Sequence, residues 1–300
     1  MWRQYRDVQY SPQGIFKALQ HNATVEDISP ALFSCLLCGA CDVLCPENID
    51  ISESIKSLRK DAFSNGYLPE LKKTIENNVS EKPQNNKTTA QGITVLAGKA
   101  LRNTPDTLNN VLRLLAHNGG ALLATDDGDD IALALEAGIT IPEKRLTDFF
   151  KSLQDANQII VNNAHLACAM QEWLPSKKLS TIGYSLSQNS KLTKRLQSTD
   201  FYVIESRAYH VDHKQRVSHY DALRHTQQCQ MNLDLQRNAI PTTASYMSEI
   251  HPRIDSAKQV QWLLAGRTMK RIVCECAEDA LSISKESELP VLHIADLMEV

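Results

Sequence analysis

The sequence has no long apolar run, no excess of basic residues and no glycine-rich phosphate-binding motif. No stretch approaches the roughly 18 apolar residues that indicate a membrane-spanning helix, so we expect no direct membrane span. The 32 lysines and arginines are balanced by 35 aspartates and glutamates, which predicts no binding to nucleic acid. The GxGxxG and Walker patterns are both absent, so no nucleotide site is predicted.

The N-terminal segment MWRQYRDVQYSPQG also lacks the apolar core of a secretory signal peptide. Four of the eight cysteines form one motif and the other four are scattered. This is not the dense pattern of a small secreted domain held by disulfides. We therefore expect a reducing compartment, the cytoplasm, and leave open a peripheral attachment to a membrane complex.

The cysteine motif is the most informative feature of the chain. Its spacing is C-x2-C-x2-C-x3-C-P, formed by Cys35, Cys38, Cys41, Cys45 and Pro46. This is the ferredoxin-type pattern for a [4Fe–4S] cluster, because thiolates from one tight loop must reach separate irons of a single cube. We predict that the four cysteines bind the iron of such a cluster.

The glycine and the proline of the motif favour the same interpretation. Gly39 lets the backbone turn without a Cβ clash, and Pro46 prevents the turn from continuing as a helix. The alternatives are a zinc site and a disulfide framework. Zinc sites prefer two separated pairs of ligands and disulfide frameworks suit small secreted domains, so neither fits this spacing well.

Hydrophobic periodicity separates a helical part from a mixed part. Residues 1–76 predict a helical domain, because apolar residues recur there at three- and four-residue steps. Asp50 or Ser52 is expected to cap the helix that follows the cysteines. Residues 77–92 are polar and almost free of apolar residues, which predicts a linker.

The rest of the chain alternates short apolar runs with amphipathic helices, which predicts a parallel sheet covered by helices. It divides into two α/β repeats, residues 93–190 and residues 200–300. Three predicted strands of the first repeat can be laid over three of the second at nearly constant spacing, which indicates an internal duplication. The aligned positions are Val95 with Val203, Ile160 with Ile272 and Ile182 with Ile294.

The whole pattern resembles the iron–sulfur subunits of the heterodisulfide reductase and glycolate or lactate oxidase group. The resemblance lies in SPQGIFKALQ before the cysteines, in Tyr209–His210, in the segment YDALR at 220–224, and in the closing segments RIVCECAEDAL and PVLHIADLM. It implies an α/β protein with a helical [4Fe–4S] ferredoxin-type head and two Rossmann-like repeats similar to the family's cysteine-rich CCG domains.

The chain departs from this family at the CCG motifs themselves. Asp126–Asp127–Gly128 stands in the first position, and Pro241–Thr242–Thr243 is the expected counterpart in the second. These residues cannot supply the soft thiolate ligands of an iron–sulfur centre, so the resemblance implies a degenerate member that lost the catalytic clusters. The remaining cysteines near family positions are Cys168, Cys229, Cys274 and Cys276.

The fourth ligand of the cluster is left open by the sequence. The family normally has two cysteine motifs, and in two-cluster ferredoxins the cysteine before proline binds the other cluster. Cys35, Cys38 and Cys41 are therefore assigned to one cluster. Cys45 either completes it or reaches a second cluster whose other cysteines lie on a partner chain.

Three further groups of residues carry two interpretations each. The histidine-rich segment is either a zinc site or proton relay or, as we favour, a surface loop and helix; it contains His210, His213, His219, His225 and Cys229. Cys274 and Cys276 could serve redox or metal chemistry at a strand end, but small buried residues are favoured. The run Asp126–Asp130 lacks the length of a calcium loop and predicts a solvated turn before a helix N-terminus.

Three functions are compatible with these observations. We prefer an electron-transfer subunit of a multi-subunit oxidoreductase, relaying single electrons through the [4Fe–4S] cluster and using the repeats to dock. Its expected partners are a flavoprotein dehydrogenase or another iron–sulfur subunit that shares cluster ligands. The alternatives are a catalytic subunit that reduces a disulfide or quinone with Cys274, Cys276 and Cys229, and an assembly protein whose cluster only holds the fold.

Overall fold

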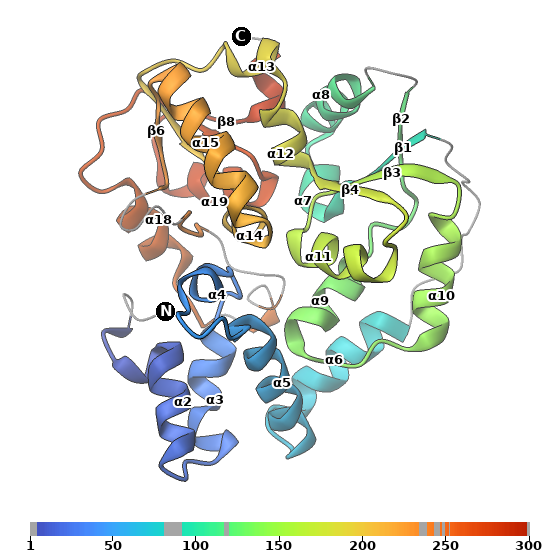
Figure 1. Ribbon diagram of the computed structural model, residues 1–300, viewed down its shortest axis with the longest axis vertical. Helices are drawn as coiled ribbons and strands as arrows, with labels where there is room; N and C mark the ends of the chain where they lie inside the picture. The colour runs from blue at the N-terminus through green and yellow to red at the C-terminus, as the bar shows by residue number, and fades with distance from the viewer. Residues whose placement is uncertain are drawn as a thin grey trace.

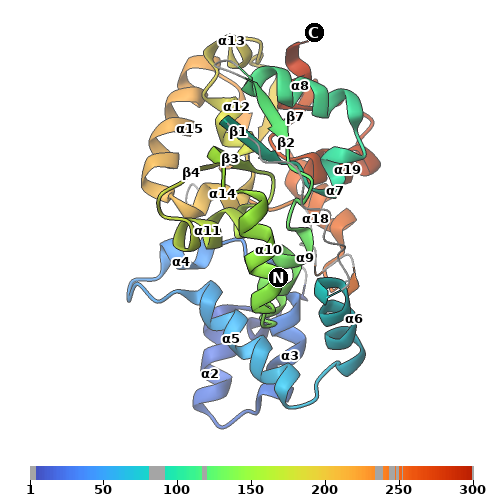
Figure 2. The ribbon, with the colours of Figure 1, turned by 90° about the vertical axis from the view of Figure 1, so that its right-hand side faces the viewer.

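The computed structural model describes residues 5–80, 92–116, 120–233, 239–242, 247, 250–251 and 253–298. A helical N-terminal unit, residues 5–80, lies at one end of the molecule and two α/β repeats lie side by side at the other (Figure 1; Figure 2). The repeats contain two parallel four-stranded sheets, which confirms the predicted α/β class.

The N-terminal unit is built from short helices around one apolar core. The predicted cap of the helix after the cysteines is Asp50, whose Oδ1 accepts a hydrogen bond of 2.8 Å from the Glu53 N–H. The last helix runs four residues past the predicted boundary at 76, and residues 81–91 of the predicted linker lie outside the described residues. The elements are η1 (Val8–Tyr10), α2 (Pro12–Gln20), α3 (Val25–Ser34), α4 (Ala40–Leu44), α5 (Ile51–Ser64) and α6 (Pro69–Ser80).

The first repeat has the strand order β2-β1-β3-β4, with all neighbouring strands parallel. Its strands are β1 (Gly92–Leu96), β2 (Ala121–Leu123), β3 (Ala156–Val161) and β4 (Lys178–Thr181). Its helices are α7 (Gly98–Arg102), α8 (Pro105–Leu115), α9 (Asp129–Ala137), α10 (Glu143–Ser152), α11 (Ala164–Trp173), α12 (Ile182–Ser187) and α13 (Ser190–Thr193).

The second repeat has the matching order β6-β5-β7-β8, again with parallel neighbours. Its strands are β5 (Asp200–Val203), β6 (Gln230–Met231), β7 (Arg271–Cys274) and β8 (Val291–His293). The helices described are α14 (Ser206–Val211), α15 (His213–Gln227), α18 (Ser256–Leu264), α19 (Ala277–Glu286) and η2 (Ile294–Met298). The same connectivity in both repeats supports the internal duplication.

The sheet registers correct the predicted overlay of the repeats. Val95 pairs with Ile160 in the first sheet, and Tyr202 pairs with Val273 in the second. All four side chains enter the same hydrophobic core, so they occupy equivalent positions. Strands buried on both faces are almost continuously apolar, and the pattern alone does not fix their register. The overlays Val95–Val203 and Ile160–Ile272 are each wrong by one residue.

The two repeats share one hydrophobic core between them. The opposite face of the first sheet packs against α9, α10 and α11, and that of the second against α18 and α19. The carboxyl ends of the first strands are fixed in the same way in both repeats. Asp127 Oδ1 accepts a bond of 3.0 Å from the Ala97 N–H, and Asn232 Oδ1 accepts one of 2.8 Å from the Ile204 N–H.

The N-terminal unit contacts both repeats. Helices α5 and α6 pack against α9, and α4 packs against α14. At Gly138, which ends α9 with a φ of 73°, an added Cβ would lie 2.3 Å from the Lys56 carbonyl oxygen. Across the described ranges of the chain, we find no helix with the length and apolar content needed to cross a membrane.

Candidate functional site

The cysteine loop connects α3 to α4 through a tight turn. Leu37 has a φ of 48° and Gly39 a φ of 77°, so left-handed residues stand on both sides of Cys38. Gly39 is the N-cap of α4, and Cys45, directly before Pro46, is its C-cap. The roles predicted for glycine and proline in the loop agree with this geometry.

Three of the four thiols are close enough to influence one another's ionisation. Burial raises the pKa of Cys38, and the charge of Cys35 raises it further, while the Ala40 N–H and the Arg207 charge oppose the increase. Burial and then repulsion from Cys38 and Cys35 raise the pKa of Cys41 to about 12. Three thiolates in this loop therefore repel one another unless cations lie between them. This set of sulfur donors fits iron, because binding of iron displaces the protons of the thiols and neutralises the charge of the thiolates.

The four motif cysteines differ in exposure. Cys41 is exposed as a whole residue although its thiol is largely surrounded by protein, whereas Cys35, Cys38 and Cys45 are half-buried. Cys35 and Cys45 both pack against the apolar core of the N-terminal unit. All eight cysteines of the chain are free thiols, so the disulfide alternative is wrong.

No three His, Cys, Asp or Glu side chains among the described residues are arranged to hold a single metal ion. A [4Fe–4S] cube makes a different geometric demand, because each thiolate binds a separate iron. Its ligands are accordingly spaced more widely than those around one ion.

A buried arginine fixes the start of the loop. Arg59 is 1% exposed, and its Nε and Nη2 donate to the Leu32 carbonyl oxygen at 3.0 and 2.8 Å. Nη2 also donates to the Cys35 carbonyl at 2.6 Å, and Nη1 donates to the Glu136 carbonyl at 2.6 Å. One guanidinium thus connects α5, the cysteine loop and the end of α9.

Helix α14 of the second repeat covers the other side of the loop. Arg207 donates from Nε and Nη2 to the Leu36 carbonyl oxygen at 3.3 and 3.2 Å. His210 lies against Gly39, where an added Cβ would be 2.8 Å from the His210 Cβ. The cysteine loop is therefore held between the N-terminal unit and the second repeat.

Neither Arg59 nor Arg207 was predicted from the sequence to hold the loop. A signal for Arg59 exists, since it follows Ile51 and Ile55 at four-residue spacing on the buried face of α5. A charged residue at a core position of an amphipathic helix indicates a specific partner. Arg207 carries no comparable signal in its local sequence.

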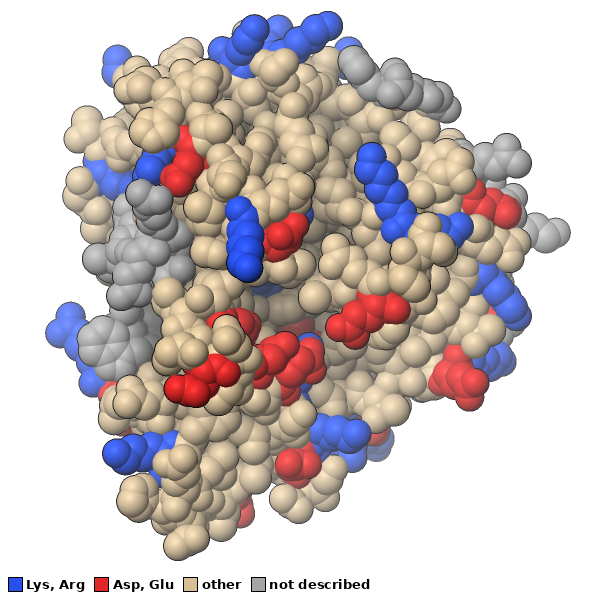
Figure 3. Space-filling view, viewed as in Figure 1, with Lys and Arg blue, Asp and Glu red and all other residues tan. Residues whose placement is uncertain are grey.

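A cavity of about 610 Å³ opens beside the loop. Its walls come from the loop, α5, the end of α9, α11 and α14, and include Cys38, His165, Cys168, Arg207 and His210. The space-filling view shows this hollow with acidic side chains around it (Figure 3). The acidic residues that line it are Asp42, Asp50, Glu53 and Glu172.

The histidine-rich segment forms α14 and α15 and does not gather its histidines at one point. His219 Nε2 lies 2.9 Å from the Ser187 hydroxyl of α12, while His225 is exposed. His210 and His213 stack with ring centroids 6.1 Å apart. His210 is 6% exposed, so the favoured interpretation of a surface segment is wrong for this residue.

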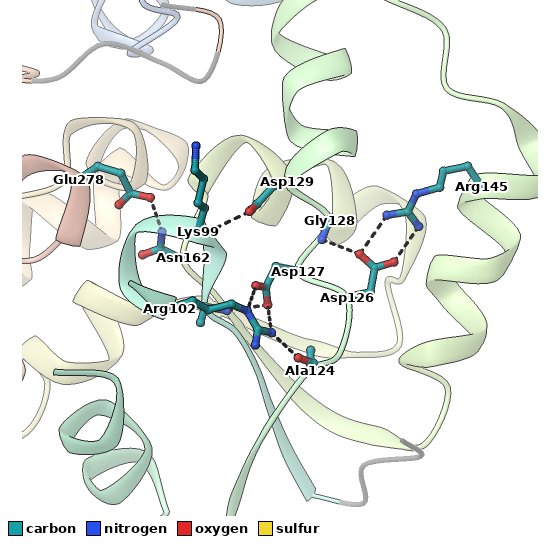
Figure 4. A network of polar contacts seen from close by, with 11 residues as sticks. Lys99, Arg102, Ala124, Asp126, Asp127, Gly128, Asp129, Arg145, Asn162 and Glu278 are labelled. Atoms are coloured by element: carbon teal, nitrogen blue, oxygen red, sulfur yellow. Dashed lines mark hydrogen bonds and ion pairs between the residues drawn. The ribbon is translucent and has the colours of Figure 1, made fainter. Parts of the chain in front are cut away.

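The acidic run of the first repeat is an ion-paired network at the carboxyl ends of the strands (Figure 4). Arg145 of α10 donates to Asp130 at 2.7 and 2.8 Å and pairs with Asp126 at 2.8 Å. Arg102 of α7 pairs with Asp127. The run does precede a helix N-terminus, but the predicted solvated turn is wrong, because two arginines neutralise the carboxylates and allow their burial.

The remaining cysteines of the second repeat do not converge. Cys274 is buried at the end of β7, and Cys276 follows it, donating from Sγ to Glu278 at 2.9 Å. Cys229 is buried just before β6, at the amino ends of the parallel strands, whereas Cys274 lies at their carboxyl ends. Burial raises the pKa of all three thiols, that of Cys229 to about 11. The favoured interpretation of Cys274 as a small buried residue is confirmed.

The second expected CCG position is described in part. The Thr242 hydroxyl is buried and donates to Asp279 of α19, whereas Thr243 lies outside the described residues. No protein-family model, curated protein or solved structure compared with the chain matches it.

Proposed function

We propose that the protein is an iron–sulfur electron-transfer subunit of a multi-subunit oxidoreductase. Cys35, Cys38 and Cys41 bind a [4Fe–4S] cluster, and the cluster relays single electrons between partner subunits. The observation that carries the proposal is the C-x2-C-x2-C loop, whose thiols lie close enough that the charges of Cys38 and Cys35 raise the pKa of Cys41.

The surface around the loop supports electron exchange with a protein partner. Cys41 is exposed, and apolar side chains beside the loop are also unusually exposed: Leu44 and Ile49 are each 49% exposed, and Val211 is 41% exposed. Apolar residues surrounded by charge are typical of sites that bind other proteins. The cavity beside the loop is lined by charged residues of both signs: Asp42, Asp50, Glu53 and Glu172 with Lys56, Lys60 and Arg207.

We further propose that the chain is a degenerate member of the heterodisulfide reductase and glycolate or lactate oxidase iron–sulfur subunits. The N-terminal unit corresponds to the ferredoxin-type head, and the two parallel sheets correspond to Rossmann-like repeats of the CCG type. The repeats lack thiols where that family has its motif. In the first repeat the carboxylates of Asp126 and Asp127 there form ion pairs with arginines. Their role in the proposal is to hold the loop and to dock partners.

The catalytic alternative receives less support. Cys229 lies at the amino ends of the parallel strands, and Cys274 and Cys276 lie at the carboxyl ends. The three thiols therefore cannot act on one substrate. Protonated thiols are poor nucleophiles, and burial holds these three in that form. Cys276→Ser separates the two functions: loss of electron flux with an intact cluster would favour catalysis in the repeats.

The direct test is anaerobic purification of the native complex, followed by iron analysis and electron paramagnetic resonance. A full cluster supplies about four iron atoms per chain. Cys38→Ser should abolish cluster loading, whereas Cys168→Ser, at an exposed position outside the motif, should not. A native chain without iron, or a cluster whose potential lies outside that of its co-purifying subunits, would refute the proposal.

A further inference from the structure

The packing of α14 on the cysteine loop brings a histidine to the cluster site. His210 is 6% exposed and contacts Gly39, between Cys38 and Cys41 in the chain. An added Cβ at Gly39 would lie 2.8 Å from the His210 Cβ and 3.7 Å from its Cγ. Cys38 and His210 also line the same cavity.

The two ring nitrogens of His210 have different surroundings. Nε2 lies 3.4 Å from the carbonyl oxygen of Ala239, which can only accept a hydrogen bond, so Nε2 carries the proton. In a neutral imidazole with its proton on Nε2, the other ring nitrogen carries no proton. Nδ1 is therefore a bare lone pair, and it is buried with no hydrogen-bond partner among the described residues.

This is the arrangement of a metal-binding histidine, in which one nitrogen donates to a backbone carbonyl and the other faces the metal. A buried acceptor without a donor costs free energy, and an iron atom at Nδ1 would remove that cost. We propose that His210 is the fourth ligand of the cluster, binding iron through Nδ1 beside Cys35, Cys38 and Cys41.

The inference rests on the proposed function, because it needs the cluster. It removes the requirement for Cys45, which packs against the apolar core of the N-terminal unit and ends α4. It also makes the second repeat part of the cluster site, since α14 supplies the ligand.

The test uses the full chain loaded with iron and sulfide under anaerobic conditions. Pulsed electron paramagnetic resonance of the reduced cluster should detect one directly bound histidine nitrogen, and its splitting should change when histidine is labelled with ¹⁵N. Cys45→Ser should keep the full iron content and the nitrogen signal. His210→Ala should lose most of the iron.

His210→Cys guards against a folding defect in the alanine variant. It should keep the iron, lose the nitrogen signal and lower the midpoint potential, because a thiolate adds negative charge to the cluster. His213→Ala, the stacked neighbour, is the matched control and should change neither signal nor potential. A loaded native cluster without nitrogen coupling, or loss of iron in Cys45→Ser, would overturn this inference alone; failure of the native chain to load iron would refute the proposed function.

Discussion

Arg59 Nη2 donates a 2.6 Å hydrogen bond to the carbonyl oxygen of Cys35, the first cysteine of the loop. The same guanidinium also holds the end of α3 and the end of α9. The position of the loop therefore depends on a charged group that is buried in the N-terminal unit and linked to the first repeat.

Replacing Arg59 with lysine should loosen the loop. Lysine keeps the charge but cannot make four bonds from a planar fork, so we expect a loss of roughly 2–4 kcal/mol in unfolding free energy. Urea unfolding measures this loss, and a chelator should remove iron faster from the variant. Lys60→Met, one residue along at an exposed position, should stay within about 0.5 kcal/mol of the parent. Equal losses in both variants would contradict the role of Arg59.

The glycine of the loop offers a matched pair of substitutions. Gly39 and Gly66 both have left-handed φ values, 77° and 84°, and alanine in that conformation costs about 1–2 kcal/mol. Only at Gly39 would the new Cβ meet another element, His210 of α14, since nothing lies within 4 Å at Gly66. Gly39→Ala should therefore destabilise the protein more than Gly66→Ala and reduce iron loading, as thermal unfolding and iron analysis would measure. Equal effects of both would show that the loop does not rest on α14.

The equivalence of Asp127 and Asn232 predicts an unequal response to two substitutions at Asp127. Asp127→Asn keeps an oxygen for the Ala97 N–H and weakens only the pairing with Arg102, which is 35% exposed, so we expect a loss under about 1 kcal/mol. Asp127→Ala leaves a buried N–H unpaired and should cost about 1–3 kcal/mol. Asn232→Ala should cost a similar amount. Denaturant midpoints for the three variants check the order, which a larger loss for asparagine would contradict.

The pH dependence of stability should contain a contribution from Glu205. Burial raises the pKa of Glu205 to about 8, against the usual 4.5, with the charges of Asp279 and Glu275 adding to the effect. The folded state therefore keeps a proton that the unfolded chain releases. Stability is lost as pH rises from about 4.5 through about 8, by at most about 1.4 kcal/mol per pH unit. Glu205→Gln should flatten the unfolding free energy over this window, and parallel curves for variant and parent would refute the assignment.

The positions of the helices and strands could be predicted from the sequence better than the long-range contacts between them. Periodicity identifies α5 and α9, and apolar runs identify β1, β3, β5 and β7, because these elements bury clear apolar faces. The two-residue strand β6 was missed, since two residues carry no alternation. Ile182 was placed in a predicted strand, but β4 ends at Thr181 and Ile182 begins α12.

The site was predictable only in part for a related reason. The spacing of the cysteines specifies the loop, because all of its residues are close in the chain. Arg207 and His210 reach the loop from a distant segment, and their contacts arise from the packing of the second repeat on the N-terminal unit. Long-range packing of this kind leaves no local pattern in a single sequence.

The dependence of the loop on α14 has a consequence for the order of events during synthesis. The four cysteines leave the ribosome early, long before the segment that contains Arg207 and His210. A nascent chain ending before β5 would expose the thiols without their cover, at a stage when stray metals and oxidants could reach them. We expect stable iron insertion to wait until the segment with Arg207 and His210 has left the ribosome. A chain stalled before β5 should therefore bind iron weakly and lose it quickly.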